Sequence, residues 1–378
     1  MKLVVLGGYG NFGARICRAL AGSPGVELCV AGRDAQRAEA LAASLPGAAA
    51  ATAVALDVHA PDFTERLVAL GAELVIHTAG PFQGQDYAVP LAVARAGAHY
   101  IDLADGRRFV CDFFTAADAA FRACGRSAIT GASTVPALSS AVVQHLAVGW
   151  QRLDGIDICI APAQTAPRGV ATLRAVLSYC GEPVRIWRGG RWTTQPGWAA
   201  PQPVRFARLR ARRGALCDIP DLELFPAHFA GVQDVMFRAA LEARWAQAGF
   251  AMLAALRQAR LIPSPVGWAR PLNAAASLFD ALGSALGGMY VRVHGVAGDG
   301  RPAQRAWHIA ADHDHGPEIP CMAAILLARR LAAGEAMAPG AQACLGQLAL
   351  AEFAPEFARW GMQTDIVEED QVGSSSQA

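Results

Sequence analysis

The sequence predicts an α/β fold in which a doubly wound parallel sheet is followed by a second, α+β domain. Three observations lead to this. Short apolar runs alternate with helical patterns through the first 150 residues, a glycine-rich turn joins the first run to the first helix, and the alternation breaks down afterwards. With 378 residues, of which 53% are hydrophobic and 17% charged, the chain has room for two domains and a sizeable core.

The glycine-rich turn follows the apolar strand 3–6 and leads directly into the helical pattern 14–21. Gly8 permits a tight turn, Gly10 lets backbone amides approach a pyrophosphate, and Gly13 lets the helix pack close to the sheet. An anion would lie at the helix N-terminus, where free N–H groups and the helix dipole favour it. The strand, turn and helix together predict a Rossmann dinucleotide-binding unit. Its expected pyrophosphate contacts are Gly8, Gly10, Asn11, Phe12 and Gly13.

The tip of the second strand, 26–32, is expected to meet the adenosine ribose, and it is followed by Arg33 and Asp34. An acidic side chain here would accept a hydrogen bond from the 2′-hydroxyl of NAD. Arg33, with its permanent charge and five donors, instead suits the 2′-phosphate of NADP. Asp34 directly precedes the helical pattern 35–45, where the N-cap is its commoner role. The strand tip therefore favours NADP over NAD.

The remaining elements of the first domain follow in regular order. The predicted strands are 52–57, 73–78, 99–103 and 127–130, and the predicted helices are 61–70, 87–96 and 109–123. Asp57 and Val58, at the tip of the third strand, are expected near the adenine. The loop after the fourth strand is expected beneath the nicotinamide, where its small residues let the backbone lie close to the ring. This loop comprises Thr78, Ala79, Gly80 and Pro81.

The carboxyl ends of the fourth, fifth and sixth strands should converge beside the nicotinamide. Asp102 falls among apolar residues within a parallel sheet, so it must be paired or have a raised pKa. Asp105 lies just past the strand and faces the expected cleft, where a carboxyl of raised pKa could donate the proton that accompanies hydride transfer. Asp105, Asp102 and Tyr100 are therefore the catalytic candidates.

Each candidate has a structural alternative. The two aspartates could cap the following helix or pair with Arg107 or Arg108, and Tyr100 could simply pack in the core. His77 lies at the end of the fourth strand and Ser133 follows the sixth, and His77 fits a core histidine better than a catalytic one.

The second half of the chain is expected to form a substrate domain over 151–315, with the chain returning to the first domain over 316–363. Its predicted elements are strands at 157–161, 204–209, 289–294 and 303–309, a long helix at 235–260 and a helix at 320–333. The turn Gly298-Asp299-Gly300 predicts that the last two strands form a hairpin. Residues 364–378 are predicted to be a disordered tail.

Composition excludes several classes of protein. A net charge of +1 argues against nucleic-acid binding, and no segment reads as a signal peptide or transmembrane span. Nine irregularly spaced cysteines without a C-x-x-C motif predict reduced thiols in a cytoplasmic protein. Lys2 is the only lysine, which excludes Schiff-base chemistry and, with it, the Tyr-x-x-x-Lys catalysis of short-chain dehydrogenases. The acidic and histidine residues at 312–315 lack a second ligand cluster, so no metal site is predicted.

Several motifs together resemble the saccharopine dehydrogenase-like oxidoreductases. They are GGYGNFG, AGRD, HTAGPFQGQDYAVPLAVARAGAHYIDLADG, GASTVPALSSAVV, DLELFP, GGMYVRV and GPEIP, and they are densest before residue 145. The resemblance implies an NAD(P)-binding Rossmann domain, an α/β substrate domain, and oxidation or reduction of imine-type C–N linkages of amino acids. The lysine-forming branch relies on a Lys–His pair, which this chain lacks near its expected cleft.

The sequence therefore predicts an NADP-dependent oxidoreductase that transfers a hydride between NADP(H) and a small, amino-acid-derived imine or carbonyl substrate. Arg168 or Arg174 could hold a substrate carboxylate. The alternative is a non-catalytic NADP-binding regulatory protein or a protein associated with a lipid surface, suggested by the apolar segment 274–289. The expected partner is a small-molecule substrate, with a homodimer left open.

Overall fold

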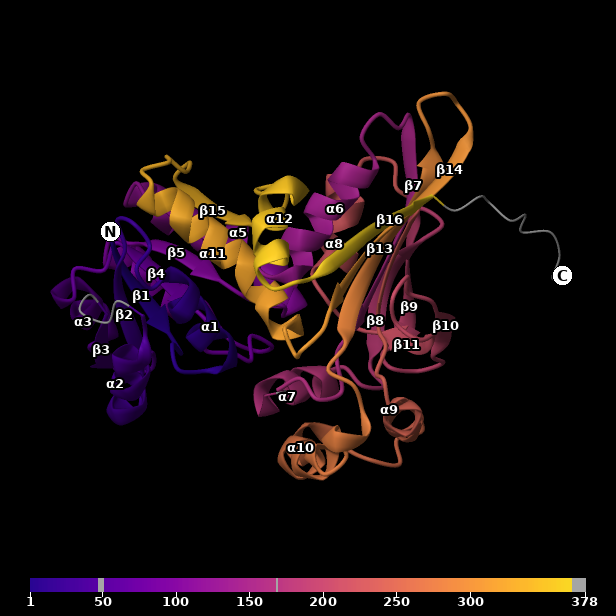
Figure 1. The fold of residues 1–378 in the computed structure, drawn as a ribbon, viewed down its shortest axis with the longest axis horizontal. Helices are drawn as coiled ribbons and strands as arrows, with labels where there is room; N and C mark the ends of the chain where they lie inside the picture. The colour runs from indigo at the N-terminus through magenta and orange to yellow at the C-terminus, as the bar shows by residue number, and fades with distance from the viewer. Residues whose placement is uncertain (47–50, 168, 369–378) are drawn as a thin grey trace, which may run out of the picture. The chain divides into compact units, whose positions relative to one another are not determined.

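The computed structural model describes residues 1–46, 51–167 and 169–368 (Figure 1). The chain divides into two compact units. Unit 1 comprises residues 1–138 and 317–348, and unit 2 comprises residues 139–316 and those that follow 348.

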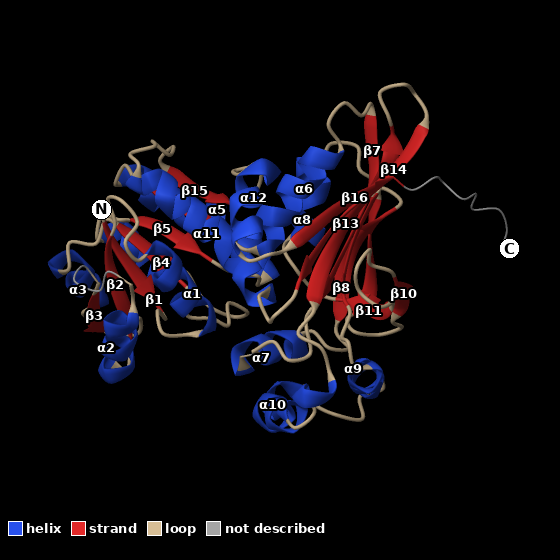
Figure 2. Cartoon of the chain, in the orientation of Figure 1, coloured by secondary structure: helices blue, strands red, loops and turns tan. Residues whose placement is uncertain are grey.

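Unit 1 contains a seven-stranded sheet in which every pairing is parallel, in the order β15-β6-β5-β4-β1-β2-β3 (Figure 2). This confirms the predicted doubly wound sheet. Its central strands are buried apolar runs, as a sheet covered on both faces requires. The strands are β1 (Lys2–Leu6), β2 (Glu27–Gly32), β3 (Thr52–Ala55), β4 (Leu74–His77), β5 (His99–Asp102), β6 (Ser127–Thr130) and β15 (Gly340–Ala343).

Helices flank this sheet and lie close to their predicted positions. Helix α1 packs against α11, whereas α3, α4 and α5 pack against one another in succession. Two helices begin earlier than predicted, α1 at Asn11 and α5 at Arg107. The helices are α1 (Asn11–Leu20), α2 (Ala35–Ser44), α3 (Phe63–Ala69), α4 (Ala88–Arg95), α5 (Arg107–Ala123) and α11 (Ile319–Ala332).

The segment that returns to unit 1 supplies α11 and the edge strand β15. It ends at Leu348, whereas the sequence predicts a return over 316–363. Two contacts fasten the start of this segment to α1. Arg15 Nε lies 2.8 Å from a carboxylate oxygen of Glu318, and the Cys321 thiol donates to the Phe12 carbonyl at 3.6 Å. The helix that carries the glycine motif is therefore held by residues three hundred positions later.

Unit 2 contains a mixed sheet whose main path runs β10-β11-β12-β7-β13-β14-β16, with β8 and β9 attached through β12. The predicted hairpin is confirmed, since β13 and β14 pair antiparallel throughout their lengths. The strands are β7 (Arg152–Ala161), β8 (Pro183–Arg188), β9 (Arg191–Pro196), β10 (Gln202–Val204), β11 (Arg212–Leu216), β12 (Asp234–Ala239), β13 (Gly287–Val296), β14 (Pro302–Ala311) and β16 (Gln363–Glu368). The helices are α6 (Ser139–Leu146), α7 (Val170–Ser178), α8 (Asp221–His228), α9 (Arg244–Gln258), α10 (Ala269–Ser277) and α12 (Leu350–Arg359).

Two predicted elements of unit 2 were wrong. The helix predicted over 235–260 begins only at Arg244, because Val235 and Phe237 bury alternate positions of a strand that pairs with β7. The strand predicted over 204–209 ends at Val204. Phe206 and Leu209 both enter the core, and side chains three residues apart cannot share one face of a strand.

The predicted disordered tail was also wrong at its start, because residues 364–368 belong to β16, which pairs with β14. Arg208 holds this strand through both carboxylate oxygens of Asp365, at 2.6 and 2.8 Å. The rest of the predicted tail, 369–378, lies outside the described residues. The apolar segment 274–289 comprises the end of α10, a connection that contains the 3-10 turn Asp280–Leu282, and the start of β13. Among the described helices, none combines the length and apolarity that crossing a membrane requires.

We predict that Glu318→Gln destabilises unit 1, because it removes the charge that pairs with the mostly buried Arg15. The free energy of unfolding should fall by about 1–3 kcal/mol, measured by urea denaturation. The control Glu335→Gln alters an exposed carboxylate 3.7 Å from Arg330 and should cost less than about 0.5 kcal/mol. Equal losses in the two variants would contradict a role for Glu318 in fastening α11 to α1.

Candidate functional site

The glycine motif forms a tight cradle at the carboxyl edge of the unit 1 sheet. The Gly8 amide donates to the Ala31 carbonyl at 2.9 Å, which fixes the turn against β2. A Cβ added to Gly13 would lie 2.2 Å from the Gly7 carbonyl oxygen, so only glycine allows α1 to start this close to the strand. No acidic residue stands in the first turn of α1, and Gly10 at its N-cap has no side chain to cap it. This cradle fits a pyrophosphate, because the helix N-terminus is left for an anion.

The loop after β4 is tied to this cradle. The Thr78 hydroxyl donates to the Leu6 carbonyl at 2.8 Å and contacts the Gly7 carbonyl at 3.2 Å. The loop then continues through Ala79, Gly80 and Pro81, where the Gln85 amide donates to the carbonyls of Ala79 and Pro81. The side chains of this loop are small, and hydrogen bonds hold two of its carbonyl groups in place. A flat ring could therefore lie directly against its backbone.

Around the tip of β2, Asp34 takes the N-cap role that the sequence favours. Its carboxylate accepts from the Arg37 amide at 3.1 Å, while its own amide donates to the Tyr9 hydroxyl at 3.0 Å. The Arg37 guanidinium lies 4.5 Å above the centre of the Tyr9 ring. Arg33 is exposed beside them. The tip of β2 thus presents the side chains of Arg33 and Arg37, while the Asp34 carboxylate caps the N-terminus of α2.

Tyr9 and Arg37 were missed at the sequence level. Tyr9 occupies a variable position of the glycine motif, and only the structure shows that its ring covers Gly32 and reaches the end of β2. Arg37 is a surface residue of a helix in the sequence pattern. On the neighbouring strand, the predicted adenine contacts Asp57 and Val58 are both half-buried, and the Asp57 carboxylate accepts from the His59 amide.

Asp102 is completely buried at the end of β5. Its Oδ1 accepts from the amides of Ala104 and Gly131 at 2.9 and 2.8 Å and from the Thr130 hydroxyl at 2.9 Å. Burial raises the pKa of Asp102 to about 6, and these three hydrogen bonds oppose the rise. One carboxylate thereby joins the ends of β5 and β6 and shapes the loop that leads to Asp105.

Tyr100 is equally buried, with its ring stacked on Phe113 at 5.8 Å between centroids. Its hydroxyl lies 3.0 Å from His77 Nδ1. Burial and the nearby Asp102 carboxylate raise the pKa of Tyr100, while burial lowers the pKa of His77 to about 4, so the imidazole is neutral at pH 7. The register pairs His77 with Asp102 across adjacent strands, which brings three titratable groups together.

Asp105 differs from these groups because it is half-buried and stands in the loop before α5. The Gln83 amide donates to its carboxylate at 3.2 Å. Burial raises the pKa of Asp105 above its usual range, and the Gln83 hydrogen bond opposes this. Gly106, next in the chain, lets the backbone of Phe82 and Gln83 pack so closely that an added Cβ would lie 3.1 Å from Phe82. The loops after β4 and β5 therefore meet at Asp105.

Other candidates from the sequence lie elsewhere. Ser133 is buried after β6, Arg174 is exposed on α7, and Arg168 lies outside the described residues. In the loop 312–315, Asp314 accepts from the Thr165 hydroxyl and His315 Nδ1 contacts the Trp360 carbonyl. Among the described residues, no three metal-ligating side chains form a cluster.

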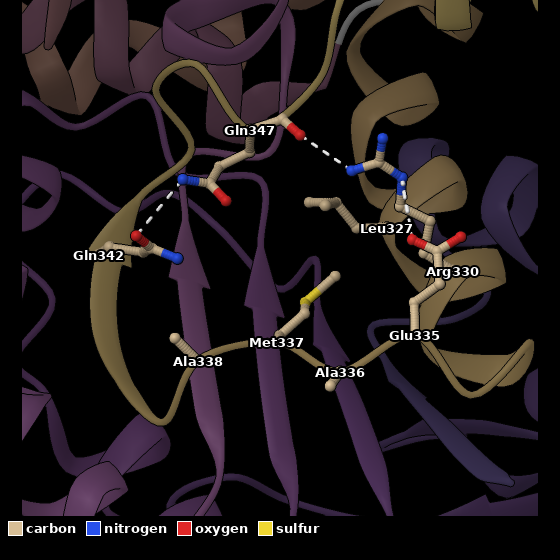
Figure 3. A pocket seen from close by; sticks show the side chains of 8 residues that line it. All are labelled: Leu327, Arg330, Glu335, Ala336, Met337, Ala338, Gln342 and Gln347. Carbon is tan, nitrogen blue, oxygen red and sulfur yellow. Dashed lines mark hydrogen bonds and ion pairs between the residues drawn. The ribbon is translucent and has the colours of Figure 1, made fainter.

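A cavity of about 320 Å³ lies between the end of α11 and β15, with Met337 pointing into it (Figure 3). Arg330 at its wall donates to the Gln347 carbonyl at 2.9 Å. The end of α11 lies close to Gly25, which precedes β2. None of the residues that line this cavity belongs to the glycine cradle.

Comparison with known proteins agrees with this geometry. Residues 3–135 match the family model of the saccharopine dehydrogenase NADP binding domain. The first segment of unit 1 therefore resembles the NAD(P)-binding domain of saccharopine dehydrogenases. No curated protein sequence matches the chain.

Solved structures show the same fold over nearly the whole chain. Saccharopine dehydrogenase (L-Glu forming) from Saccharomyces cerevisiae has a TM-score of 0.67 at 12% identity, covering 98% of this chain and 100% of that one. Homospermidine synthase from Legionella pneumophila, in complex with NAD, has a TM-score of 0.62 at 9% identity, covering 100% and 93%. At such identities the likeness shows the fold alone. The protein thus has an NAD(P)-binding, dehydrogenase-like fold with a second, mixed-sheet domain.

We predict that Asp102→Asn flattens the pH dependence of stability. Because folding raises the pKa of Asp102 from 3.8 to about 6, its contribution is full below pH 4 and is lost as pH rises through 6. Between pH 4 and pH 6 the free energy of unfolding of the wild type should fall by on the order of 3 kcal/mol more than that of the variant. Urea titrations at each pH measure this difference. The control Asp112→Asn, at a carboxylate whose side chain is 46% exposed, should retain the wild-type slope. Parallel slopes for Asp102→Asn and wild type would contradict the buried titration.

Proposed function

We propose that the protein is an NADP-dependent oxidoreductase that transfers a hydride between NADP(H) and a small, amino-acid-derived imine or carbonyl substrate. The observation that carries this proposal is the edge of the unit 1 sheet, where the glycine cradle and the half-buried carboxyl of Asp105 are linked by the loop after β4. One edge thus offers both an anion site and a proton donor. The family match and the dehydrogenase-like fold support a redox role.

The preference for NADP over NAD rests on the charges at the tip of β2. Binding of NAD would favour a carboxylate that is free to accept from the ribose, but Asp34 already accepts from the Arg37 amide. Arg33 and Arg37 supply two guanidinium groups that suit a 2′-phosphate. The Tyr9 ring positions Arg37 by lying beneath its guanidinium, and the Tyr9 hydroxyl accepts from the Asp34 amide, next in the chain to Arg33.

We predict that NADPH binds at least about tenfold more tightly than NADH, and that Arg33→Ala and Arg37→Ala each reduce this ratio by removing one charge-assisted contact. Titration calorimetry with both nucleotides measures the ratio. Arg18→Ala, on the C-terminal turn of α1, is the matched control and should leave the ratio unchanged. A ratio that survives the double variant of Arg33 and Arg37 would overturn the phosphate assignment.

In the proposed reaction the nicotinamide, when bound, supplies or accepts the hydride, and the chain provides the accompanying proton. Asp105 is the group placed for this, because it is half-buried and has a raised pKa. In the reducing direction its carboxyl donates to the nitrogen or oxygen of the substrate, and in the oxidising direction its carboxylate takes that proton back. The Gln83 amide orients the carboxyl. We assign Asp102 and Tyr100 positioning roles, since both side chains are sealed from solvent.

The substrate class follows from the resemblance and from one absence. Lys2, the only lysine, begins the first strand, so the Lys–His pair of lysine-forming saccharopine dehydrogenases has no counterpart at this edge. We therefore propose an imine or carbonyl compound other than saccharopine. All nine cysteines are free, which supports a reducing compartment such as the cytoplasm.

We predict that Asp105→Asn lowers kcat by about 100-fold or more with unchanged NADPH affinity, because it removes the general acid. In the reducing direction, wild-type activity should fall as pH rises through the raised pKa of Asp105. Stopped-flow oxidation of NADPH over a panel of amino-acid-derived imines and ketones measures both effects. The control Asp112→Asn, at a carboxylate whose side chain is 46% exposed, should behave as the wild type. Unaltered turnover in Asp105→Asn would remove it from the acid role.

A further inference from the structure

Helix α9 in unit 2 turns an apolar stripe toward solvent. Exposed apolar residues recur along it every three or four positions, and Arg244 and Gln258 are its exposed polar residues. Trp245 is 53% exposed and Met252 is 60% exposed. The stripe consists of Trp245, Ala248, Met252, Ala255 and Ala259. The opposite side of the helix is covered, as the stacking of Phe250 on Trp198 shows. Both sides of this helix are therefore largely apolar, whereas a surface helix is usually polar on the side that faces solvent.

The segment that follows extends this surface. Leu278 is 79% exposed and Leu282 is 81% exposed, whereas Phe279 packs its ring 4.9 Å from that of Trp245. Figure 1 shows α9 and α10 at the same end of the unit 2 sheet. Of the thirteen exposed large hydrophobic side chains among the described residues, seven lie between Trp245 and Leu282. We call the exposed apolar residues between Trp245 and Leu282 the apolar face.

The charges around the apolar face are mainly positive, with Asp280, between Phe279 and Leu282, as the acidic exception. Between Glu242 and Asp280 the sequence has four arginines and no acidic residue. Arg257 is engaged with Glu182 at 2.6 Å, but Arg244, Arg260 and Arg270 are exposed. Arg260 also lines a cavity of about 510 Å³ next to Leu261 and Ile262. Exposed tryptophan, leucine and methionine side chains thus share this segment with exposed arginine side chains.

We propose that the apolar face docks unit 2 on an anionic lipid membrane. Helices that lie in a membrane interface combine tryptophan, phenylalanine and leucine with arginine, and anionic headgroups attract the arginines. The helices concerned, α9 with 15 residues and α10 with 9, are too short to span a bilayer, so the protein lies on the surface. A second copy of the chain fits poorly, because a two-fold interface would place the arginines of one copy against those of the other.

The test uses the full-length protein and vesicles of phosphatidylcholine, with or without 30% phosphatidylglycerol. Co-sedimentation should show binding only with phosphatidylglycerol present, weakening as salt rises. The triple variant Trp245→Ser, Met252→Ser, Leu278→Ser and the charge variant Arg244→Gln, Arg260→Gln, Arg270→Gln should each lower the partition coefficient at least about tenfold. The matched control Val68→Ser, Phe114→Ser, Val148→Ser alters side chains at least 57% exposed elsewhere and should bind as the wild type.

Far-ultraviolet circular dichroism and NADPH affinity should be the same in all variants, which separates loss of docking from loss of folding. Absence of binding to anionic vesicles, equal binding to neutral ones, or equal loss in the control would overturn the proposal. A dimer that the Trp245, Met252 and Leu278 substitutions dissociate, without vesicle binding in the wild type, would assign the face to a second copy instead. These outcomes are independent of whether the protein reduces an imine.

Discussion

Parallel pairing is the constraint on which unit 1 depends. The register aligns Leu6 with His77, and His77 with Asp102, so successive strands end at one edge. Every loop that follows a strand is delivered to that edge, since a parallel sheet requires a crossover after each strand. The glycine cradle, Thr78, Asp102 and Asp105 meet because the register holds, and not because they are close in sequence. The Asp102 carboxylate then fastens this edge by joining the ends of two strands.

The first half of the sequence predicted its structure well, and the reason is local. Each strand there is an apolar run bounded by turn residues, and each helix has its own period, so no distant partner was needed to recognise them. The edge strand β15 escaped prediction because Gly340-Ala341-Gln342-Ala343 has neither an apolar run nor β-branched residues. Its strand conformation comes from pairing with β6.

The secondary structure of unit 2 was less predictable, because it depends on which strands pair with one another in the fold. Residues 234–239 fit a helix by composition, yet they form a strand because they pair with β7. At the candidate site, the residue types of the cradle were predictable from spacing, whereas the Tyr9–Arg37 stack and the Gln83–Asp105 hydrogen bond join residues that no spacing rule connects. The structure also distinguishes Asp102 from Asp105 by their burial, a difference that the sequence does not show. Asp102 is sealed and Asp105 is half-open.

The late return of the chain to unit 1 has a consequence for biosynthesis. The first 138 residues supply six strands of the sheet, but β6 is an edge strand until β15 is added. An unpaired edge is a template for association with other chains. As the ribosome makes this protein, the β6 edge of the first domain therefore stays unpaired while residues 139–316 of unit 2 are synthesised. Completion of the first domain is thus among the last events of translation, which couples its folding to that of the domain inserted within it.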